Sequence, residues 1–206
     1  MSDKIQTIVQ IGVYTNAEYL QLVDPIKYPP ELCGKLPIDF PQLHNGRWNY
    51  IGIDMGAYSI ERCRKKYEPS ADIKFMQRLI YDDDIEVEHD GYRVGAMGGI
   101  VQPSISLDTL INKELSLRPT LLALDIEGSE LPILKGYSWY VKPRLIVIEM
   151  HRSVDIDEIH SILTKNGYLL QAVAYQSDAL NVAYERIKNS VNQAKRVPFH
   201  ITSARP

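Results

Sequence analysis

The sequence has little cysteine, no long hydrophobic run and little net charge, and each shortage excludes a class of protein. Its two cysteines, Cys33 and Cys63, have a spacing that suits neither a zinc site nor a disulfide framework. No apolar run approaches the roughly 20 residues that cross a bilayer, and the start of the chain lacks the apolar segment of a signal peptide. We therefore expect a cytoplasmic protein with reduced thiols and no membrane span.

The formal net charge of −3 gives no reason to expect nucleic acid as the main partner. Basic residues do cluster at Arg62, Arg64, Lys65 and Lys66. We interpret this cluster as the solvated face of a helix.

The pattern of hydrophobic residues predicts a single doubly wound α/β domain over residues 1–206. Short apolar runs alternate with segments of helical period, which is typical of βαβ units and a mainly parallel sheet. Predicted strands span 5–13, 50–54, 73–80, 120–125, 145–150, 168–174 and 180–184, the last two forming a closing antiparallel pair. Predicted helices span 16–23, 59–67, 130–135 and 155–166, with another that Ser106 caps. Residues 85–94 read as a hairpin with Asp90-Gly91 at its turn.

Residues 25–47 interrupt this alternation. They contain five prolines and two glycines, a composition that suits neither a helix nor a strand. We predict a long ordered loop that folds over the binding pocket as a lid or substrate wall.

Polar side chains gather where the predicted parallel strands end, which is the edge of an open α/β sheet that binds ligands. They follow strands one to five in order: Gly12; Asp54; Gln77 and Arg78; Asp125 and Glu127; Glu149 and His151. Solvation of strand ends explains only part of this convergence. The edge is therefore the predicted site.

Individual residues at this edge suggest particular roles. The loop after Gly12 has too few glycines for a dinucleotide fingerprint, which disfavours a Rossmann dehydrogenase. Asp54 can accept hydrogen bonds from ribose hydroxyls, although a solvated strand-end acid is the alternative. Asp125 and Glu127, one residue apart on a segment expected to be extended, would point to one side and orient a substrate hydroxyl or hold a metal. Capping of the next helix by Glu127 or Ser129 is the alternative for that turn. His151 could take a proton from a hydroxyl near neutral pH, although a lone histidine is more often a satisfied polar residue.

These motifs resemble a known family. The segments ISLDTLI, LLALDIEGSELPILKGYSW and PRLIVIEMH resemble the core of the FkbM-type methyltransferases, with its Asp-x-Glu-Gly-x-Glu turn. WNYIGIDMGAYSIERCRKKY, IKFMQRLIYDDDIEVEHDG and TIVQIGVYTN resemble the family's second, third and first strands. The resemblance implies a class I methyltransferase fold with a seven-stranded sheet and S-adenosylmethionine as cofactor. It also implies methylation of a hydroxyl on a sugar, glycan, lipid or other small metabolite.

The resemblance assigns cofactor contacts to six residues: Gly12, Asn16, Asp54, Met55, Gln77 and Asp125. Gly12 is the first glycine of the methionine-binding loop, and Asn16 stands where the family has a second glycine. Asparagine tolerates a left-handed backbone better than most residues. Asp54 is the ribose acid, and Gln77 lies in the segment that lines the adenine pocket.

Two hypotheses follow from these residues. The first is an O-methyltransferase with His151, Glu127 and Asp125 as catalytic residues. The second is a binding module that keeps the fold without catalysis. Asn16 favours it slightly, as does the proline-rich segment 25–47, which replaces much of the family's usual first helix. Asp125, Glu127, Glu149 and His151 also offer hard ligands suited to magnesium, but no spacing demands a metal and we predict none.

Overall fold

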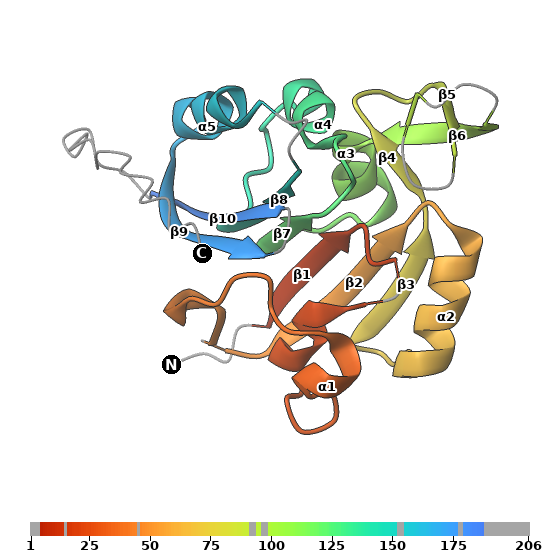
Figure 1. Ribbon diagram of the computed structural model, residues 1–206, viewed down its shortest axis with the longest axis vertical. Helices are drawn as coiled ribbons and strands as arrows, with labels where there is room; N and C mark the ends of the chain where they lie inside the picture. Colours follow the sequence, from red (N-terminus) through yellow and green to blue (C-terminus); the bar gives the residue numbers. More distant parts are fainter. Residues whose placement is uncertain are drawn as a thin grey trace.

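A seven-stranded sheet forms the centre of the computed structural model (Figure 1). The structure describes residues 5–14, 16–44, 46–90, 94–95, 99–151, 155–176 and 179–187. In spatial order the strands are β3 (Ile73–Gln77), β2 (Trp48–Asp54), β1 (Gln6–Ile11), β7 (Leu121–Leu124), β8 (Leu145–Met150), β10 (Ala179–Arg186) and β9 (Tyr168–Gln176). The first five are parallel to one another, whereas β10 is antiparallel to both β8 and β9. The predicted sheet and its closing antiparallel pair are confirmed.

Helices cover both faces of this sheet, as a doubly wound fold requires (Figure 1). One face packs against α4 (Glu130–Gly136), α5 (Ile156–Lys165), α3 (Leu107–Thr109) and the π-helical turn η3 (Leu110–Glu114). The other face packs against α2 (Ala57–Tyr67) and the segment between β1 and β2. Each face thus buries its own apolar cluster. The carboxyl ends of the parallel strands form an edge of the sheet between the two covering layers.

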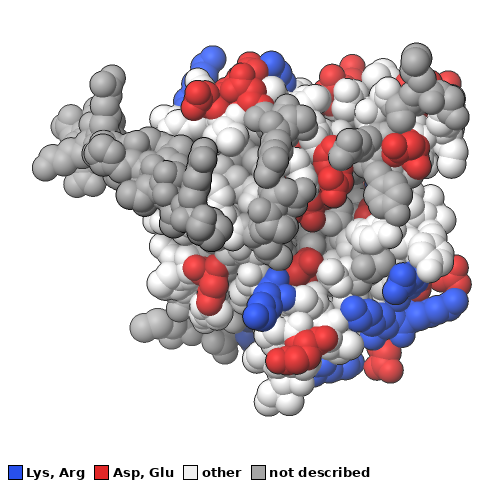
Figure 2. Space-filling view, in the orientation of Figure 1, with Lys and Arg blue, Asp and Glu red and all other residues white. Residues whose placement is uncertain are grey.

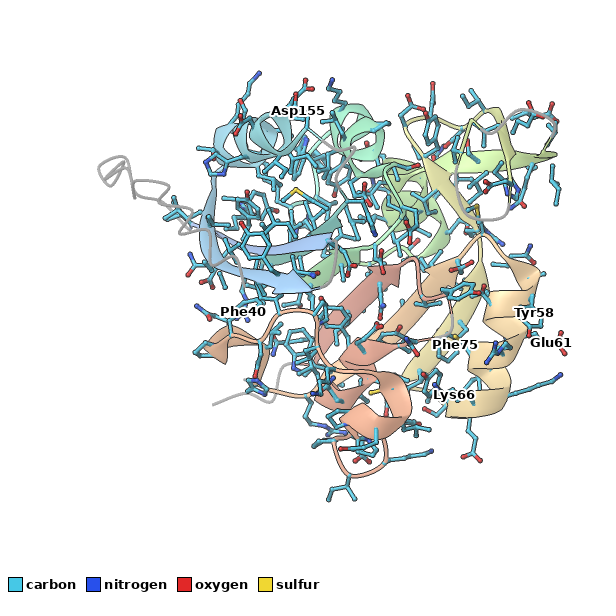
Figure 3. All side chains as sticks on the ribbon, in the orientation of Figure 1. Phe40, Tyr58, Glu61, Lys66, Phe75 and Asp155 are labelled. Atoms are coloured by element: carbon cyan, nitrogen blue, oxygen red, sulfur yellow. The ribbon has the colours of Figure 1, made fainter. Side chains whose placement is uncertain are left out.

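Two predicted helix starts have the side-chain caps expected from the sequence. The Ser106 hydroxyl accepts a hydrogen bond from the Thr109 amide at 3.2 Å, at the start of α3. The Asp155 carboxylate accepts one from the Glu158 amide at 2.9 Å, at the start of α5 (Figure 3). Each bond satisfies an amide that has no partner within its own helix.

The segment between β1 and β2 differs from its prediction. Residues 16–23 contain only a 3₁₀ turn, η1 (Glu18–Leu22), instead of a helix. Residues 25–47 are not loop throughout, because they include the one-turn helix α1 (Pro30–Cys33) and the 3₁₀ turn η2 (Pro41–His44). Pro30 stands at the first position of α1, where a missing N–H costs nothing.

Residues 25–47 take the place of a helix on the sheet. Tyr28, Ile38, Phe40 and Leu43 are all buried in the apolar cluster of that face. The Tyr28 hydroxyl donates to the Tyr67 carbonyl of α2 at 3.1 Å. The segment is therefore part of the core layer next to α2.

The predicted strand 73–80 and the predicted hairpin 85–94 are both wrong in detail. The strand breaks at Arg78, and its second half becomes β4 (Leu79–Tyr81) in a separate small sheet. The strand β5 (Glu86–His89) pairs with β6 (Ile100–Ser106), which also pairs with β4. Within the described residues, the expected hairpin is reduced to one bridge between His89 and Val94, and Gly91 of the expected turn lies outside them. β6 was missed because Pro103 sits within it, and proline argues against a middle strand.

The surface and thiol predictions can be compared directly with the structure. Cys33 and Cys63 are both buried and unbridged. The basic residues 62 and 64–66 are exposed on α2, whose outer face also carries the exposed Tyr58 and Glu61 (Figures 2 and 3). No helix in the described part of the chain is long and apolar enough to cross a membrane.

Candidate functional site

A cavity of about 250 Å³ lies at the carboxyl edge of the sheet. Its walls come from the residues that follow β1, β2 and β7, and from the turn between β3 and β4. Strand order reverses between β1 and β7, which is where open α/β sheets bind ligands. Acidic side chains lie in the hollow at the middle of this face (Figure 2). The sequence-predicted edge is therefore the edge that carries the cavity.

Gly12 lies where the ends of β1 and β7 approach each other. Its φ is +88°, and a Cβ atom placed on it would lie 1.6 Å from the Asp125 carbonyl oxygen. Any other residue would therefore be strained and would also push β1 away from β7. The neighbouring strand therefore requires glycine at this position. The close approach of a ligand, which the sequence predicts, is a separate reason for a glycine here.

Asp54 ties together the loops that follow β1 and β2. Its carboxylate accepts one hydrogen bond from the Tyr14 amide and one from the Gly56 amide, both at 2.8 Å. Burial raises its pKa, and the hydrogen bonds from Gly56, Tyr14 and Ser59 oppose that rise. Each carboxylate oxygen can accept a second hydrogen bond, so Asp54 can still bind ribose hydroxyls.

Other predicted cofactor residues are placed unevenly around the cavity. Asn16 and Met55 line it, whereas Gln77 does not, and Gln77 donates instead to the Met55 carbonyl at 3.2 Å. After Gly12, the residue with a left-handed backbone among the described positions of the first loop is Tyr14, with φ of +36°, and not Asn16. Arg78, beside Gln77, does line the cavity, and its Nε–H donates to both carboxylate oxygens of Glu114, at 2.7 and 3.0 Å.

The three predicted catalytic residues meet at one end of the cavity. Asp125, Glu127 and His151 each place a side-chain N or O atom within 4.8 Å of the others. Asp125 and Glu127 line the cavity, and His151 stands beside them with its Nε2 atom 3.4 Å from Glu127 Oε2 and 3.9 Å from Glu149 Oε1. The segment was expected to be extended, but it is not, because Glu127 has φ of +53°. The two carboxylates converge through a tight turn.

Asp125 has an unusual electrostatic environment. Burial raises its pKa to about 8, with further contributions from the charges of Glu149, Glu18, Glu127 and Glu130. Asp125 is therefore largely protonated at neutral pH when no cation is nearby. Such a group can change its charge when a cationic ligand arrives.

The turn after β7 is organised by Glu130, which is absent from the predicted site residues. Glu130 is fully buried, and its Oε1 atom accepts from the amides of Ile126 and Gly128 at 3.1 and 3.3 Å. Burial raises its pKa. Ser129 makes no side-chain cap of α4, so the capping alternative fails for that residue. The third acid of the Asp-x-Glu-Gly-x-Glu motif was the available indication of Glu130.

A second group, Gln10 and Glu18, was also missed. Gln10 Nε2 donates to Glu18 Oε2 at 2.8 Å, and Gln10 Oε1 accepts from the Tyr50 hydroxyl at 2.7 Å. Glu18 lines the cavity, and burial raises its pKa. Neither residue stands directly after a strand, so the rule that located the other acids does not apply to them.

Comparison with known proteins identifies the family. Residues 42–170 match the family model described as the methyltransferase FkbM domain. The chain belongs to the FkbM methyltransferase family. As a member it is a methyltransferase that uses S-adenosylmethionine as cofactor. No curated protein sequence matches the chain significantly.

Solved structures similar to this FkbM methyltransferase share its fold. M. capricolum TrmK, in complex with S-adenosylhomocysteine, has a TM-score of 0.51 and 15% identity, over 93% of this chain and 67% of that one. The fibrillarin pre-rRNA processing protein of Methanococcus jannaschii has a TM-score of 0.51 and 11% identity, over 90% of this chain and 69% of that one. At these identities the likeness shows the class I methyltransferase fold alone.

Proposed function

We propose that this FkbM methyltransferase transfers the methyl group to a hydroxyl of a sugar, a glycan or another small metabolite. The observation that carries the proposal is the cluster of Asp125, Glu127 and His151 at one end of the cavity. Carboxylates accept hydrogen bonds from hydroxyls, and histidine takes up protons near neutral pH. The family and its usual acceptors support the same reaction.

Bound S-adenosylmethionine supplies a methyl group on a good leaving group, so the protein has only to align the acceptor oxygen and take its proton. Glu127 faces the cavity and accepts the hydrogen bond of the acceptor hydroxyl. His151, whose Nε2 atom lies 3.4 Å from Glu127 Oε2, receives the hydroxyl proton through the Glu127 carboxylate and so serves as the general base. Asp125 orients the hydroxyl from the other side. Gly12, Asn16, Asp54, Met55 and Asp125 bind the cofactor, and Gln77 acts through the Met55 backbone.

The same three residues would also suit a divalent cation, but we propose that none is required. His151 Nε2 already lies 3.4 Å from Glu127 Oε2, so the two groups can share a proton and need no cation between them. Dialysis against EDTA should leave turnover and the affinity for S-adenosylhomocysteine unchanged. A loss that magnesium or manganese restores would contradict the metal-free mechanism.

The catalytic roles can be separated with two substitutions. His151→Ala should keep the affinity for S-adenosylhomocysteine and lose roughly 10²–10⁴-fold in turnover, the usual contribution of a general base. Glu127→Ala should impair turnover and acceptor binding together. The acceptor is found by screening monosaccharides and glycans with radiolabelled S-adenosylmethionine, and exposed His44 serves as the control substitution. If His151→Ala kept nearly full turnover while Glu127→Ala abolished it, the base would be a carboxylate after β7.

A further inference from the structure

A second cavity, of about 40 Å³, adjoins the larger one and shares Asp125 and Glu18 with it. Its floor is a row of polar residues, Asp125, Glu149 and Asn181, at the ends of β7, β8 and β10. Glu149 and Asn181 are direct partners across β8 and β10, and Asp125 follows Leu124, the partner of Ile148. The preceding residues on this face belong to an apolar cluster. A polar row there needs a purpose beyond packing.

The wall of this small cavity contains buried polar atoms without partners. Asn181 is completely buried, yet within the described residues neither its Oδ1 nor its Nδ2 atom has a hydrogen-bond partner. Tyr19 is also buried, with 2% of its surface exposed. Within the described residues its hydroxyl likewise has no hydrogen-bond partner. A buried polar group without a partner destabilises the folded protein. Gln10, which also lines the cavity, is satisfied by Glu18 and Tyr50, so the unpaired atoms are those of Asn181 and Tyr19.

The unpaired atoms define the chemistry of the occupant. Asn181 Nδ2 and the Tyr19 hydroxyl need an acceptor, whereas Asn181 Oδ1 needs a donor. A hydroxyl group both donates and accepts. An ammonium group only donates and would leave Asn181 Nδ2 unpaired, and an anion is disfavoured by the acidic residues Glu18 and Glu149 in the cavity wall. The volume suits one or two small polar groups, since a water molecule takes up about 30 Å³ in the liquid.

We propose that the small cavity anchors a second hydroxyl of the methyl acceptor, which is therefore a diol or polyol, and that Asn181 selects for it. The proposal rests on the proposed O-methyltransferase function. Because the two cavities share Asp125 and Glu18, a hydroxyl anchored between Asn181 and Tyr19 would hold the rest of the acceptor beside the larger cavity, which Glu127 lines. Lys35 and Pro37 form part of the wall, so residues 25–47 reach the acceptor side.

Three small probes test this assignment: trans-1,2-cyclohexanediol, cyclohexanol and trans-2-aminocyclohexanol. Their dissociation constants are measured by NMR titration of the protein saturated with S-adenosylhomocysteine. The diol should bind about tenfold more tightly than cyclohexanol, as expected for one additional buried hydrogen-bonded hydroxyl. Equal binding of the diol and cyclohexanol would overturn the proposal, because the cavity would then hold only water. Tighter binding of the amine than of the diol would also overturn it.

Two variants tie the diol preference to the cavity. Asn181→Leu should abolish it without loss of thermal stability, because the substitution removes unpaired polar atoms and roughly keeps the side-chain volume. Tyr19→Phe should reduce it several-fold, and it provides a second variant if Asn181→Leu does not fold. Asn49→Leu is the matched control and should keep the preference, because Asn49 lies near the amino-terminal end of β2, away from the carboxyl ends that carry the cavities. A preference that survives in both cavity variants would show that the diol binds elsewhere.

The outcome for the anchoring site is separable from the outcome for the proposed function. If the wild type binds S-adenosylhomocysteine and methylates a hydroxyl but shows no preference for the diol, only the anchoring site is wrong. If it methylates a nitrogen or carbon atom of an acceptor and no hydroxyl, the O-methyltransferase assignment fails. The diol titration still reports on the cavity in that case.

Discussion

Asp125 has an unusual protonation state for an acidic residue. Burial, with the charges of Glu149 and Glu18 next in order, raises its pKa to about 8 from the usual value near 3.8. Between these two pH values the folded protein holds a proton that the unfolded chain has lost. Folding stability from this group is therefore present at low pH and is lost as the pH rises toward 8.

Asp125→Asn should thus be more stable than the wild type by a margin that grows with pH. The asparagine stays neutral, so it avoids the cost of burying a charge. Between pH 5 and pH 8 the difference in Tm should grow by at least 2–4 °C, the shift that about 1 kcal/mol produces in a domain of this size. Differential scanning calorimetry of the ligand-free protein measures it, with exposed Asp157→Asn as control. A constant margin across this range would mean that Asp125 titrates normally.

Asp54 should matter for the cofactor more than for the fold. Asp54→Ala removes the acceptor for two loop amides and for the ribose, so the affinity for S-adenosylhomocysteine should fall by about 1–3 kcal/mol, the range for hydrogen bonds to a charged group. Isothermal titration calorimetry gives the affinity directly. Asp72→Ala, at an exposed acid before β3, is the control. Equal affinity in the wild type and Asp54→Ala would remove Asp54 from the site.

Among the secondary-structure elements, the buried strands and the capped helices could be predicted from the sequence. Their apolar runs, their caps and the glycine after α5 all favour one structure. The prediction failed where tertiary context decides. Nothing in the run 73–80 shows that it leaves the main sheet at Arg78, where the Arg78 amide bonds the Asp54 carbonyl at 2.9 Å. Pro103 likewise conceals a strand whose partners are distant in sequence.

The junction of β1 and β7 gives a prediction at this scale. Gly12→Ala should destabilise the protein far more than Gly167→Ala, although both glycines have φ near +88°. At Gly167 nothing lies within 4 Å of the added Cβ atom, so only the left-handed backbone costs about 1–2 kcal/mol. At Gly12 the collision with the Asp125 carbonyl is added. Chemical denaturation measures both, and similar losses would show that β1 and β7 can separate without cost.

For the whole molecule, the position of the site was predictable but its full membership was not. Parallel strands bring their carboxyl ends to one edge, so Gly12, Asp54 and Asp125 could be placed together without a structure. Asn181 could not, because its position beside Glu149 depends on β10 entering the sheet between β8 and β9. Glu18 lies in a 3₁₀ turn whose path depends on the packing of the residues around it.

Residues 25–47 should unfold together with the rest of the domain. Their apolar side chains belong to the core cluster, and Gln42 contacts Arg144 and Glu185. Trypsin should therefore cut after the exposed Lys27 and Lys35 only as the circular dichroism signal of the whole domain is lost in urea. Mass spectrometry identifies the cuts. Cleavage at these lysines while the signal is still native would show a segment that opens by itself, as the predicted lid would.

The burial of Asp125 in the wall of the larger cavity has a consequence for the energetics of the reaction cycle. Asp125 is largely protonated in the free protein, and it lines the cavity that we assign to a cofactor with a positively charged sulfonium. Cofactor binding is then coupled to release of a proton from Asp125, and its affinity rises as the pH approaches 8. Methyl transfer removes the sulfonium charge, so the carboxylate regains its proton. The product is thereby held less tightly than the cofactor, which favours exchange of one for the other after each turnover.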